Sequence, residues 1–366
     1  MRIISQLVPS GKPVSTDIEA TRQTGKNTWE IPAWGHPLAL GVYPFFVTRN
    51  RRLIPVGTAF CISSLGVSIT ALHNTLEATR RHWENDFMRQ MDPLSAGYTM
   101  KDIGMALFHH QALPGGTLSG NISSLEFIEG APPTDVGYVS PQFQSGFPYL
   151  PLPISFAVPR IGSRVVCVGF GDLPVPDVGL SLDDIQCGRI NLLDAYQHRL
   201  LAVEGRVTRI FTQRFENGFI GGPCFTIDAE INHGMSGGPV FSENGYVCGI
   251  NSAGATNFFG KPASIVSLFY PALVMNVRFG GQIGRVRITS NRRLIELIAQ
   301  GAVITDGSEN LVTIRSDSGE SLLGPTIHGE DADCIYDDFQ GFQEGRHATR
   351  ESKDVYRFNH KRRKGT

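Results

Sequence analysis

The stretch Thr226-Ile-Asp-Ala-Glu-Ile-Asn-His-Gly-Met-Ser-Gly-Gly-Pro-Val-Phe241 carries the strongest indication of fold and chemistry in this sequence. Ser236 lies within it in a Gly-x-Ser-Gly-Gly-Pro pattern, between Gly234 and Gly237. Glycines in these places allow a tight turn, because they adopt backbone conformations that other residues avoid. Backbone amides that converge at such a turn can stabilise a negatively charged oxygen. Ser236 is therefore a candidate nucleophile.

A serine hydroxyl becomes a nucleophile when a nearby base takes its proton and a third group orients that base. The chain offers 10 histidines. Only His73 directly follows an apolar strand pattern, in Ile69-Thr-Ala-Leu-His-Asn74. The end of a strand would hold an imidazole at the edge of a core, where its proton can come and go near neutral pH. We predict that His73 is the base and that an aspartate elsewhere orients it.

The rest of the chain is rich in turn residues and short apolar runs. Of 366 residues, 41 are Gly and 22 are Pro, and 41% are hydrophobic, which is typical of a globular protein. Apolar runs bounded by turn residues indicate strands, and they occupy residues 38–47, 52–63, 66–71, 104–109, 124–128, 136–139, 164–168, 199–211 and 247–250. Short strands at this frequency predict an all-β barrel or sandwich.

Three segments have a helical pattern instead. Residues 75–91 contain no Gly or Pro and carry apolar residues at helical spacing. Beyond Pro262 the pattern predicts two more helices, at 264–275 and 291–300. We therefore expect one helix inserted among the strands, and we expect the β body to end near Pro262.

The two ends of the chain look irregular. Residues 1–35 are polar and predict an unstructured lead-in without the apolar run of an export signal. Residues 330–344 are acidic and residues 345–366 are basic, which predicts a flexible tail. The basic cluster His360-Lys-Arg-Arg-Lys364 is interpreted as a solvated end rather than a nucleic-acid site.

Charge and cysteine content narrow the partners. The net charge is −1, so the whole chain has no electrostatic footprint for nucleic acid, and no stretch has the length of a membrane span. The 6 cysteines lack CxxC spacing and predict neither a zinc site nor a disulfide framework. The neighbours His109 and His110 are likewise interpreted as strand residues, not metal ligands. We expect a cytoplasmic protein with no metal and no cofactor.

Two motifs resemble those of a known family. Thr70-Ala-Leu-His73 resembles the Thr-Ala-x-His signature, and Gly234-Met-Ser-Gly-Gly-Pro239 the Gly-x-Ser-Gly-Gly-Pro signature, of trypsin-like serine proteases. Gly57-Thr-Ala-Phe-Cys-Ile62 and Gly249-Ile-Asn-Ser252 are similar to the HtrA/Deg branch of that family. The resemblance covers residues 38–275, with no recognisable PDZ domain behind it.

The resemblance implies a fold and a division of the chain. The fold is all-β, with two six-stranded β-barrels of the chymotrypsin type, an inserted helix and a C-terminal α-helical or irregular extension. The peptidase domain would span residues 36–290, between the lead-in 1–35 and an extension 291–366. Met235 precedes the serine where digestive relatives have an aspartate, so the resemblance predicts no activation by release of a new amino terminus.

Two aspartates fit the position of the family's acid. Asp102 and Asp135 each stand just before a short apolar strand. The family's next landmark contains Gly162, which lies 27 residues after Asp135 (162 − 135) and 60 after Asp102 (162 − 102). The shorter gap suits the family better, so we favour Asp135, with Asp102 as the alternative.

The resemblance also implies an oxyanion hole, formed by the amides of Gly234 and Ser236 with that of Gly237. A peptide substrate would add as a strand beside Ser252, Ala253 and Gly254.

A specificity residue is also implied. Glu230 matches the base of the primary specificity pocket, where a carboxylate would select Lys or Arg, but it can equally face solvent, and both readings stay open. Asn251 stands where glutamyl endopeptidases carry a histidine, so a preference for Glu is not expected.

These residues predict a serine endopeptidase that acts on protein or peptide substrates through an acyl-enzyme. Its catalytic residues would be His73, Asp135 and Ser236. A catalytically silent or partner-switched peptide-binding module of the same fold is the alternative, and an esterase ranks below both. The charge blocks of the C-terminal extension suggest a regulatory protein partner in addition to the substrate.

Overall fold

The computed structural model of the chain describes most of the expected β body. The described residues are 22–25, 27–32, 36–49, 52–75, 103–112, 118–130, 134–141, 149–171, 180–187, 189, 199–214, 222–258, 261–283, 286–317, 320–324, 331 and 335–338. Almost all of the predicted helix at 75–91, the alternative acid Asp102 and the basic end of the tail lie outside these residues.

The first barrel is built from six antiparallel strands. They are β3 (Val42–Arg49), β4 (Arg52–Cys61), β5 (Ser68–Ala71), β6 (Ile103–Ala112), β7 (Leu118–Gly130) and β8 (Val136–Pro141). Their order is β4-β3-β6-β7-β8-β5, and pairing between β4 and β5 closes the barrel. The short strand β10 (Leu180–Ser181), which leads into the helix α2 (Leu182–Gln186), pairs with β4 outside the ring.

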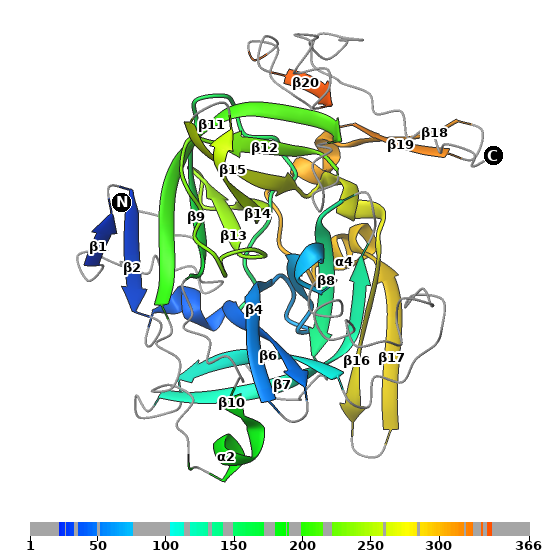
Figure 1. The fold of residues 1–366 in the computed structure, drawn as a ribbon. Helices are drawn as coiled ribbons and strands as arrows, with labels where there is room; N and C mark the ends of the chain where they lie inside the picture. Colours follow the sequence, from blue (N-terminus) through cyan, green and yellow to red (C-terminus); the bar gives the residue numbers. More distant parts are fainter. Residues whose placement is uncertain are drawn as a thin grey trace, which may run out of the picture.

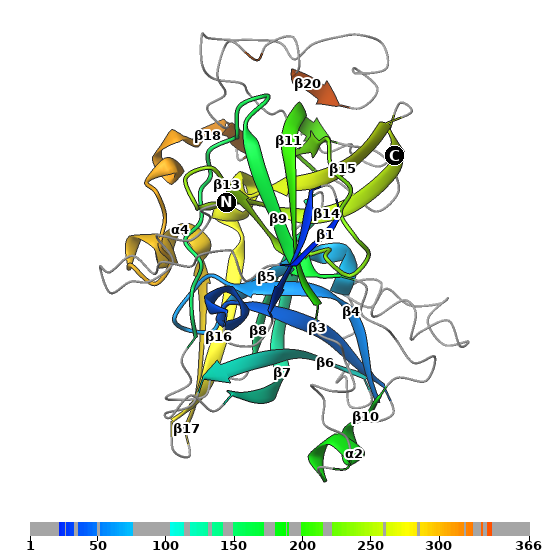
Figure 2. The ribbon, with the colours of Figure 1, turned by 90° about the vertical axis from the view of Figure 1, so that its left-hand side faces the viewer.

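The second barrel also contains six antiparallel strands. They are β9 (Arg164–Phe170), β11 (Arg199–Arg214), β12 (Cys224–Ile227), β13 (Pro239–Ser242), β14 (Val247–Phe258) and β15 (Lys261–Leu268). Their order is β11-β12-β15-β14-β13-β9, and pairing of β11 with β9 closes the ring. Figures 1 and 2 show the two barrels stacked, with β9 and β11 to β15 above β3 to β8. The predicted all-β double barrel of the chymotrypsin type is confirmed.

The main hydrophobic core runs from one barrel into the other. Phe60, Ile69 and Tyr138 of the first barrel belong to the same buried cluster as Phe225 and Val266 of the second. A separate, smaller cluster around Tyr43 and Phe45 fills the first barrel. Since one continuous core joins the barrels, loops at their junction are held by both.

Two regions expected to be irregular contribute strands. In the lead-in, β1 (Arg22–Gly25) and β2 (Thr28–Pro32) form a hairpin that pairs with β11. In the tail, β20 (Ile335–Asp338) pairs with β11 in parallel, and Ile335 is fully buried. Both predictions were wrong for these segments, because a strand is stabilised by its partner and β11 is far away in the sequence.

The expected end of the β body near Pro262 was also wrong. Residues 261–268 form β15, which pairs with β12 and β14. In place of the helix predicted at 264–275, the structure has the end of this strand and the short 3-10 helix η3 (Tyr270–Val274). The β-branched Ile265 and Val266 suit a strand with a partner on each side.

A separate two-stranded sheet follows the two barrels. It is a hairpin of β16 (Asn276–Ile283) and β17 (Val286–Arg293), which lies beside β7 and β8 and is clearly visible in Figure 1. The helix α4 (Leu294–Ala299) begins only after β17, so the predicted helix at 291–300 starts late. The remaining elements are η2 (Pro37–Leu40), η4 (Ser308–Leu311), β18 (Thr313–Asp317) and β19 (Glu320–Gly324). Within the described ranges, no helix has the length and apolarity needed to cross a membrane.

Candidate active site

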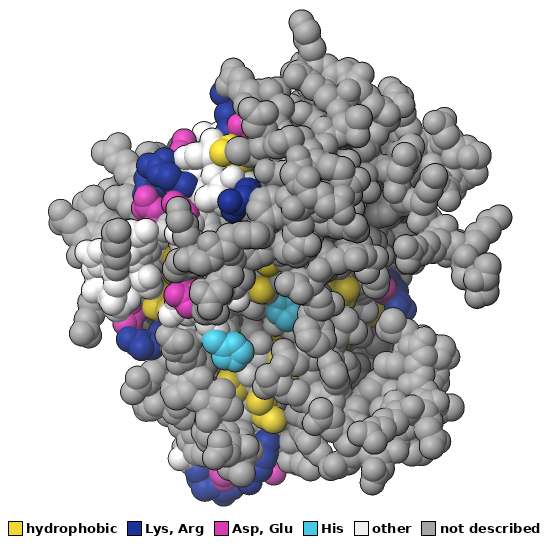
Figure 3. All heavy atoms as spheres, turned by 45° about the horizontal axis from the view of Figure 1, so that its top comes forward, with side chains coloured by type: hydrophobic (Ala, Val, Ile, Leu, Met, Phe, Trp, Pro, Cys, Tyr) yellow, Lys and Arg dark blue, Asp and Glu magenta, His cyan; other side chains and the backbone are white. Residues whose placement is uncertain are grey.

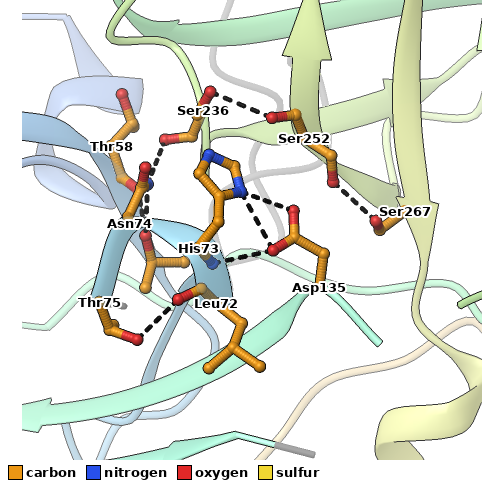
Figure 4. A network of polar contacts seen from close by, with 10 residues as sticks. Thr58, Leu72, His73, Asn74, Thr75, Asp135, Ser236, Ser252 and Ser267 are labelled. Carbon is orange, nitrogen blue, oxygen red and sulfur yellow. Dashed lines mark hydrogen bonds and ion pairs between the residues drawn. The ribbon is translucent and has the colours of Figure 1, made fainter. Parts of the chain in front are cut away.

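Strand register brings His73 and Asp135 together. β5 pairs with β8 so that Ala71 lies opposite Val136, and the amide of Leu72 donates to the carbonyl oxygen of Asp135 at 2.9 Å. His73 follows one strand of this pair and Asp135 precedes the other. Figure 4 shows the two side chains facing one another across this strand pair.

The Asp135 carboxylate makes two kinds of contact with His73. Its Oδ2 lies 2.8 Å from His73 Nδ1, and its Oδ1 accepts the backbone N–H of His73 at 2.9 Å. An ionised carboxylate can only accept, so Nδ1 carries the proton and the lone pair of a neutral imidazole is on Nε2. The Asp135 side chain is 1% exposed and that of His73 is 16% exposed. The imidazole is therefore oriented by a buried acid while it stays partly exposed.

Ser236 comes from the other barrel, on the turn that leads into β13. In Figure 4 it lies beside the imidazole, on the side away from Asp135. Its Oγ donates to the carbonyl oxygen of Ser252 on β14 at 3.2 Å. The structure thus brings the three predicted catalytic side chains together, with the serine hydroxyl directed at Ser252 and not at His73.

The Ser236 turn (residues 234–238) requires its glycines. Gly237 has φ of 86°, and a Cβ on it would lie 2.1 Å from the carbonyl oxygen of Thr58. Gly234 has φ of 89°, and a Cβ there would lie 2.7 Å from the carbonyl oxygen of Phe170. Both the backbone conformation and the close approach of neighbouring strands exclude other residues.

The three amides predicted to form an oxyanion hole differ in their hydrogen bonding in this structure. Gly237 N–H donates to the carbonyl oxygen of Asn251 at 2.7 Å, so it is already in use and does not fit the predicted role. Within the described part of the chain, the amides of Gly234 and Ser236 donate to no protein group. Those two remain suitable donors for a negatively charged oxygen.

The predicted substrate-binding residues differ in how far they are exposed to solvent. Ser252 is buried, Ala253 is half-buried and Gly254 is exposed, so the exposure of β14 increases along these three residues. The hydroxyl of Ser252 bonds that of Ser267 at 2.6 Å. Glu230 is exposed. Of the two readings left open for Glu230, the structure shows the one in which it faces solvent.

Polar side chains that the motifs did not indicate hold the Ser236 turn. Asn74 Nδ2 donates to the carbonyl oxygen of Ser236 at 2.8 Å. Thr58 Oγ1 donates to that of Gly234 at 2.9 Å, and Asn251 Nδ2 to that of Met235 at 3.2 Å. Asn74 and Thr58 lie 162 and 176 residues away from their partners, so no local pattern could reveal these contacts.

The other candidate groups are packed in the cores. His109 and His110 lie in β6, against the rings of Tyr43 and Phe170 respectively, and burial lowers the pKa of His109 to about 3. Among the described cysteines, only Cys187 is exposed. The other four (Cys61, Cys167, Cys224 and Cys248) are buried as free thiols, and burial raises their pKa values. On the face drawn in Figure 3, histidine side chains reach the surface next to apolar atoms, and charged groups lie toward the rim.

Comparisons with known proteins give one family match and distant similarities to solved structures. The family model described as "Trypsin-like peptidase domain" matches residues 57–250. Among solved structures, the active form of the Rv3671c protease from M. tuberculosis is 18% identical, over 65% of this chain and 82% of that one, with a TM-score of 0.38. The MamO protease domain from Magnetospirillum magneticum is 15% identical, over 64% and 94%, also with a TM-score of 0.38. No curated protein sequence matches the chain. Since the family model spans just over half of the 366 residues, the chain belongs to the trypsin-like peptidase domain family.

Proposed function

We propose that this protein is a serine endopeptidase that hydrolyses peptide bonds of protein or peptide substrates through an acyl-enzyme. The observation that carries the proposal is the hydrogen bond between the buried Asp135 carboxylate and His73 Nδ1 at 2.8 Å, with Ser236 beside the opposite edge of the imidazole. A fixed tautomer leaves Nε2 ready to accept a proton from a serine hydroxyl.

The proposed reaction has two halves. Ser236 Oγ attacks the peptide carbonyl carbon as its proton passes to His73 Nε2, and the amides of Gly234 and Ser236 hold the carbonyl oxygen that becomes negative. His73 then returns the proton to the leaving amine, and the C–N bond breaks to leave an ester on Ser236. A water molecule, deprotonated by His73, hydrolyses that ester and restores the free hydroxyl.

The substrate backbone has a part in this proposal. The carbonyl oxygen of Ser252 accepts the hydroxyl of Ser236 in the free protein. An extended substrate paired beside Ser252, Ala253 and Gly254 would offer its own N–H to this edge. The serine hydroxyl would then turn about one side-chain bond toward His73.

The proposed setting is a reducing one. The buried free thiols of the described residues suit a cytoplasmic location, which is part of the proposal.

Specificity for Lys or Arg has no support from the exposed position of Glu230. A regulatory partner that binds the C-terminal extension stays a prediction, which truncation after Asp338, the last residue of β20, tests. Truncation that changes neither activity nor partner recovery counts against it.

The first experiment is labelling with a fluorophosphonate, read by intact mass. The wild-type chain should gain one adduct and Ser236→Ala none. Cleavage of fluorescent casein by the wild type, absent in Ser236→Ala, would extend the result from acylation to peptide hydrolysis.

One observation favours a second function, a peptide-binding module that does not turn over. The hydrogen bond of Ser236 Oγ goes to Ser252 rather than to His73, as expected of a nucleophile that is not activated. A folded wild-type chain that resists the fluorophosphonate even with casein present would support this second function and reject the first.

A further inference from the structure

Thr58 on β4 touches the Ser236 turn with a side chain that is entirely buried. Its Oγ1 donates to the carbonyl oxygen of Gly234 at 2.9 Å and accepts the backbone N–H of Phe170, also at 2.9 Å. A carbonyl oxygen can only accept and an amide N–H can only donate, so the direction of both hydrogen bonds is fixed. One hydroxyl therefore joins the first barrel, the end of β9 and the turn that carries the nucleophile.

The backbone of Thr58 is directed at the same turn. Its N–H donates to the carbonyl oxygen of Ser236 at 2.8 Å, and its own carbonyl accepts the hydroxyl of Thr70 at 2.7 Å. Pro44 lies opposite Thr58 on β3 and has no N–H to offer that carbonyl. At Thr58 the backbone N–H of β4 therefore bonds to the Ser236 turn and the backbone carbonyl bonds to Thr70, and Pro44 on the neighbouring strand donates to neither.

These contacts fix two carbonyl groups on either side of Met235. Thr58 holds the carbonyl oxygens of Gly234 and Ser236, and between the held carbonyl and its own N–H the Gly234 backbone has φ of 89°. Glycine has the widest conformational freedom of any residue, so this is where the turn would rearrange most easily. The amides of Gly234 and Ser236, which no group of the described chain accepts, then keep their orientation.

We propose that Thr58 is a positioning residue for acyl transfer: its hydroxyl holds the Gly234 peptide so that the amides of Gly234 and Ser236 stay aimed at the developing oxyanion. The inference rests on the proposed function and assigns a role in it to a residue of the first barrel. Phe170 N–H and the carbonyl of Gly234 share the same hydroxyl. A shift of one barrel relative to the other would therefore also move the turn that carries Ser236.

The test compares Thr58→Val, which keeps the shape and removes the hydroxyl, with Thr58→Ser, which keeps the hydroxyl. The probe is p-nitrophenyl acetate, for which the limiting acylation rate and the half-saturating concentration are measured separately. Loss of a single oxyanion donor costs about 100- to 1000-fold, so a misaimed donor in Thr58→Val should lower the acylation rate by about 10- to 100-fold. The half-saturating concentration should change by less than about threefold, because ground-state binding is not affected.

Controls separate positioning from general stability. Thr208→Val removes another threonine hydroxyl of the described barrels, one bonded to Thr226 at 2.7 Å, and should acylate like the wild type. Thr58→Ser should recover most of the rate. If Thr58→Val does not fold, Thr58→Cys, whose thiol is a weaker donor, should acylate at a rate between those of Thr58→Ser and an unreactive chain.

The outcomes that overturn the inference are distinct. A folded Thr58→Val or Thr58→Cys chain with the wild-type acylation rate overturns it and leaves the proposed function standing. So does a loss in Thr58→Val that Thr58→Ser does not restore. A wild-type chain that p-nitrophenyl acetate and the fluorophosphonate fail to acylate at Ser236 overturns the proposed function, and this inference with it.

Discussion

The acid–base pair and the Ser236 turn are held in different ways. His73 and Asp135 sit at the adjoining ends of two neighbouring strands, and the pairing of β5 with β8 sets their distance. The Ser236 turn lies outside the regular strand ladder. Single backbone hydrogen bonds with Thr58 and Asn251 hold it, together with side chains from three separate segments, namely those of Thr58, Asn74 and Asn251.

This difference predicts which part of the site is distorted first when the packing of the barrels changes. A strand ladder resists distortion because many backbone hydrogen bonds act together, whereas the turn depends on a few buried side chains. Two of those side chains belong to the first barrel and one to the second. Changes at the barrel junction should therefore disturb Ser236 and its amides before they disturb the His73–Asp135 pair.

Breaking the pair itself should have the largest effect. In Asp135→Asn, the amide NH₂ turned toward His73 Nδ1 would favour the wrong tautomer, with the proton on Nε2. We expect the rate of fluorophosphonate labelling to fall by about 10⁴-fold, the size of loss that this change causes in a Ser-His-Asp triad. Asn can still accept the N–H of His73 through its Oδ1, so the thermal unfolding temperature should change little. Labelling at the wild-type rate would remove Asp135 from the triad.

Loosening the turn from the side of the second barrel should have a smaller effect. Asn251 is fully buried and its Nδ2 donates to the carbonyl oxygens of Val168 and Met235. A trans peptide points its N–H away from its C=O, so holding the carbonyl of Met235 directs the amide of Ser236 away from Asn251.

Asn251→Leu should therefore slow acylation by about tenfold, a fraction of what a lost oxyanion donor costs. Unpaired carbonyls should lower the free energy of unfolding by about 1–3 kcal/mol. The rate of acylation is measured with p-nitrophenyl acetate, and the free energy of unfolding is measured by urea titration. The pH midpoint of labelling should not move, because Asn251 does not touch His73. A shifted midpoint would show that the two halves of the site are not independent.

The same contrast explains what the sequence could predict. Ser236 and His73 stand in short motifs, and a turn or a strand end is a local structure that a few residues can specify. Asp135 needed the spacing to a later strand, which only a family resemblance supplies. Thr58 and Asn251 lie in stretches that resemble the family, but no local pattern indicates their contacts with the turn, because these contacts are made across the packed barrels.

The errors in the fold have a related cause. Residues 261–268 pair with β12 and β14, β2 and β20 pair with β11, and β1 pairs with β2. Their own sequences are compatible with helix or irregular structure, and the partner decides between the two. Glu230 shows the limit of motif spacing, since the number of residues before Ser236 does not determine which way its side chain points.

A buried histidine of the first barrel should make the free energy of unfolding depend on pH. Burial lowers the pKa of His109 to about 3 in the folded chain, against about 6.5 when unfolded. Below about pH 6.5 the unfolded chain binds a proton that the folded chain does not, so the free energy of unfolding falls as the pH falls, by at most about 1.4 kcal/mol per unit.

His109→Phe, which keeps a ring against Tyr43, should flatten this slope between about pH 6 and 4. Urea unfolding at several pH values measures it. An unchanged slope in the variant would show that the group responsible is another one.

The smallest effect is expected at Glu230, which belongs to neither the pair nor the support of the turn. Its exposed side chain is surrounded by water that screens its charge, so removing that charge should hardly change the electrostatic potential at the active site. Glu230→Gln should alter the ratio of cleavage rates for peptides with Lys and with Ala before the cleaved bond by less than about twofold. Mass spectrometry of cleaved peptide mixtures gives that ratio. A marked loss of cleavage after Lys would mean that substrate draws Glu230 into the site, and the segment that precedes Ser236 would then have to move by more than the turn itself.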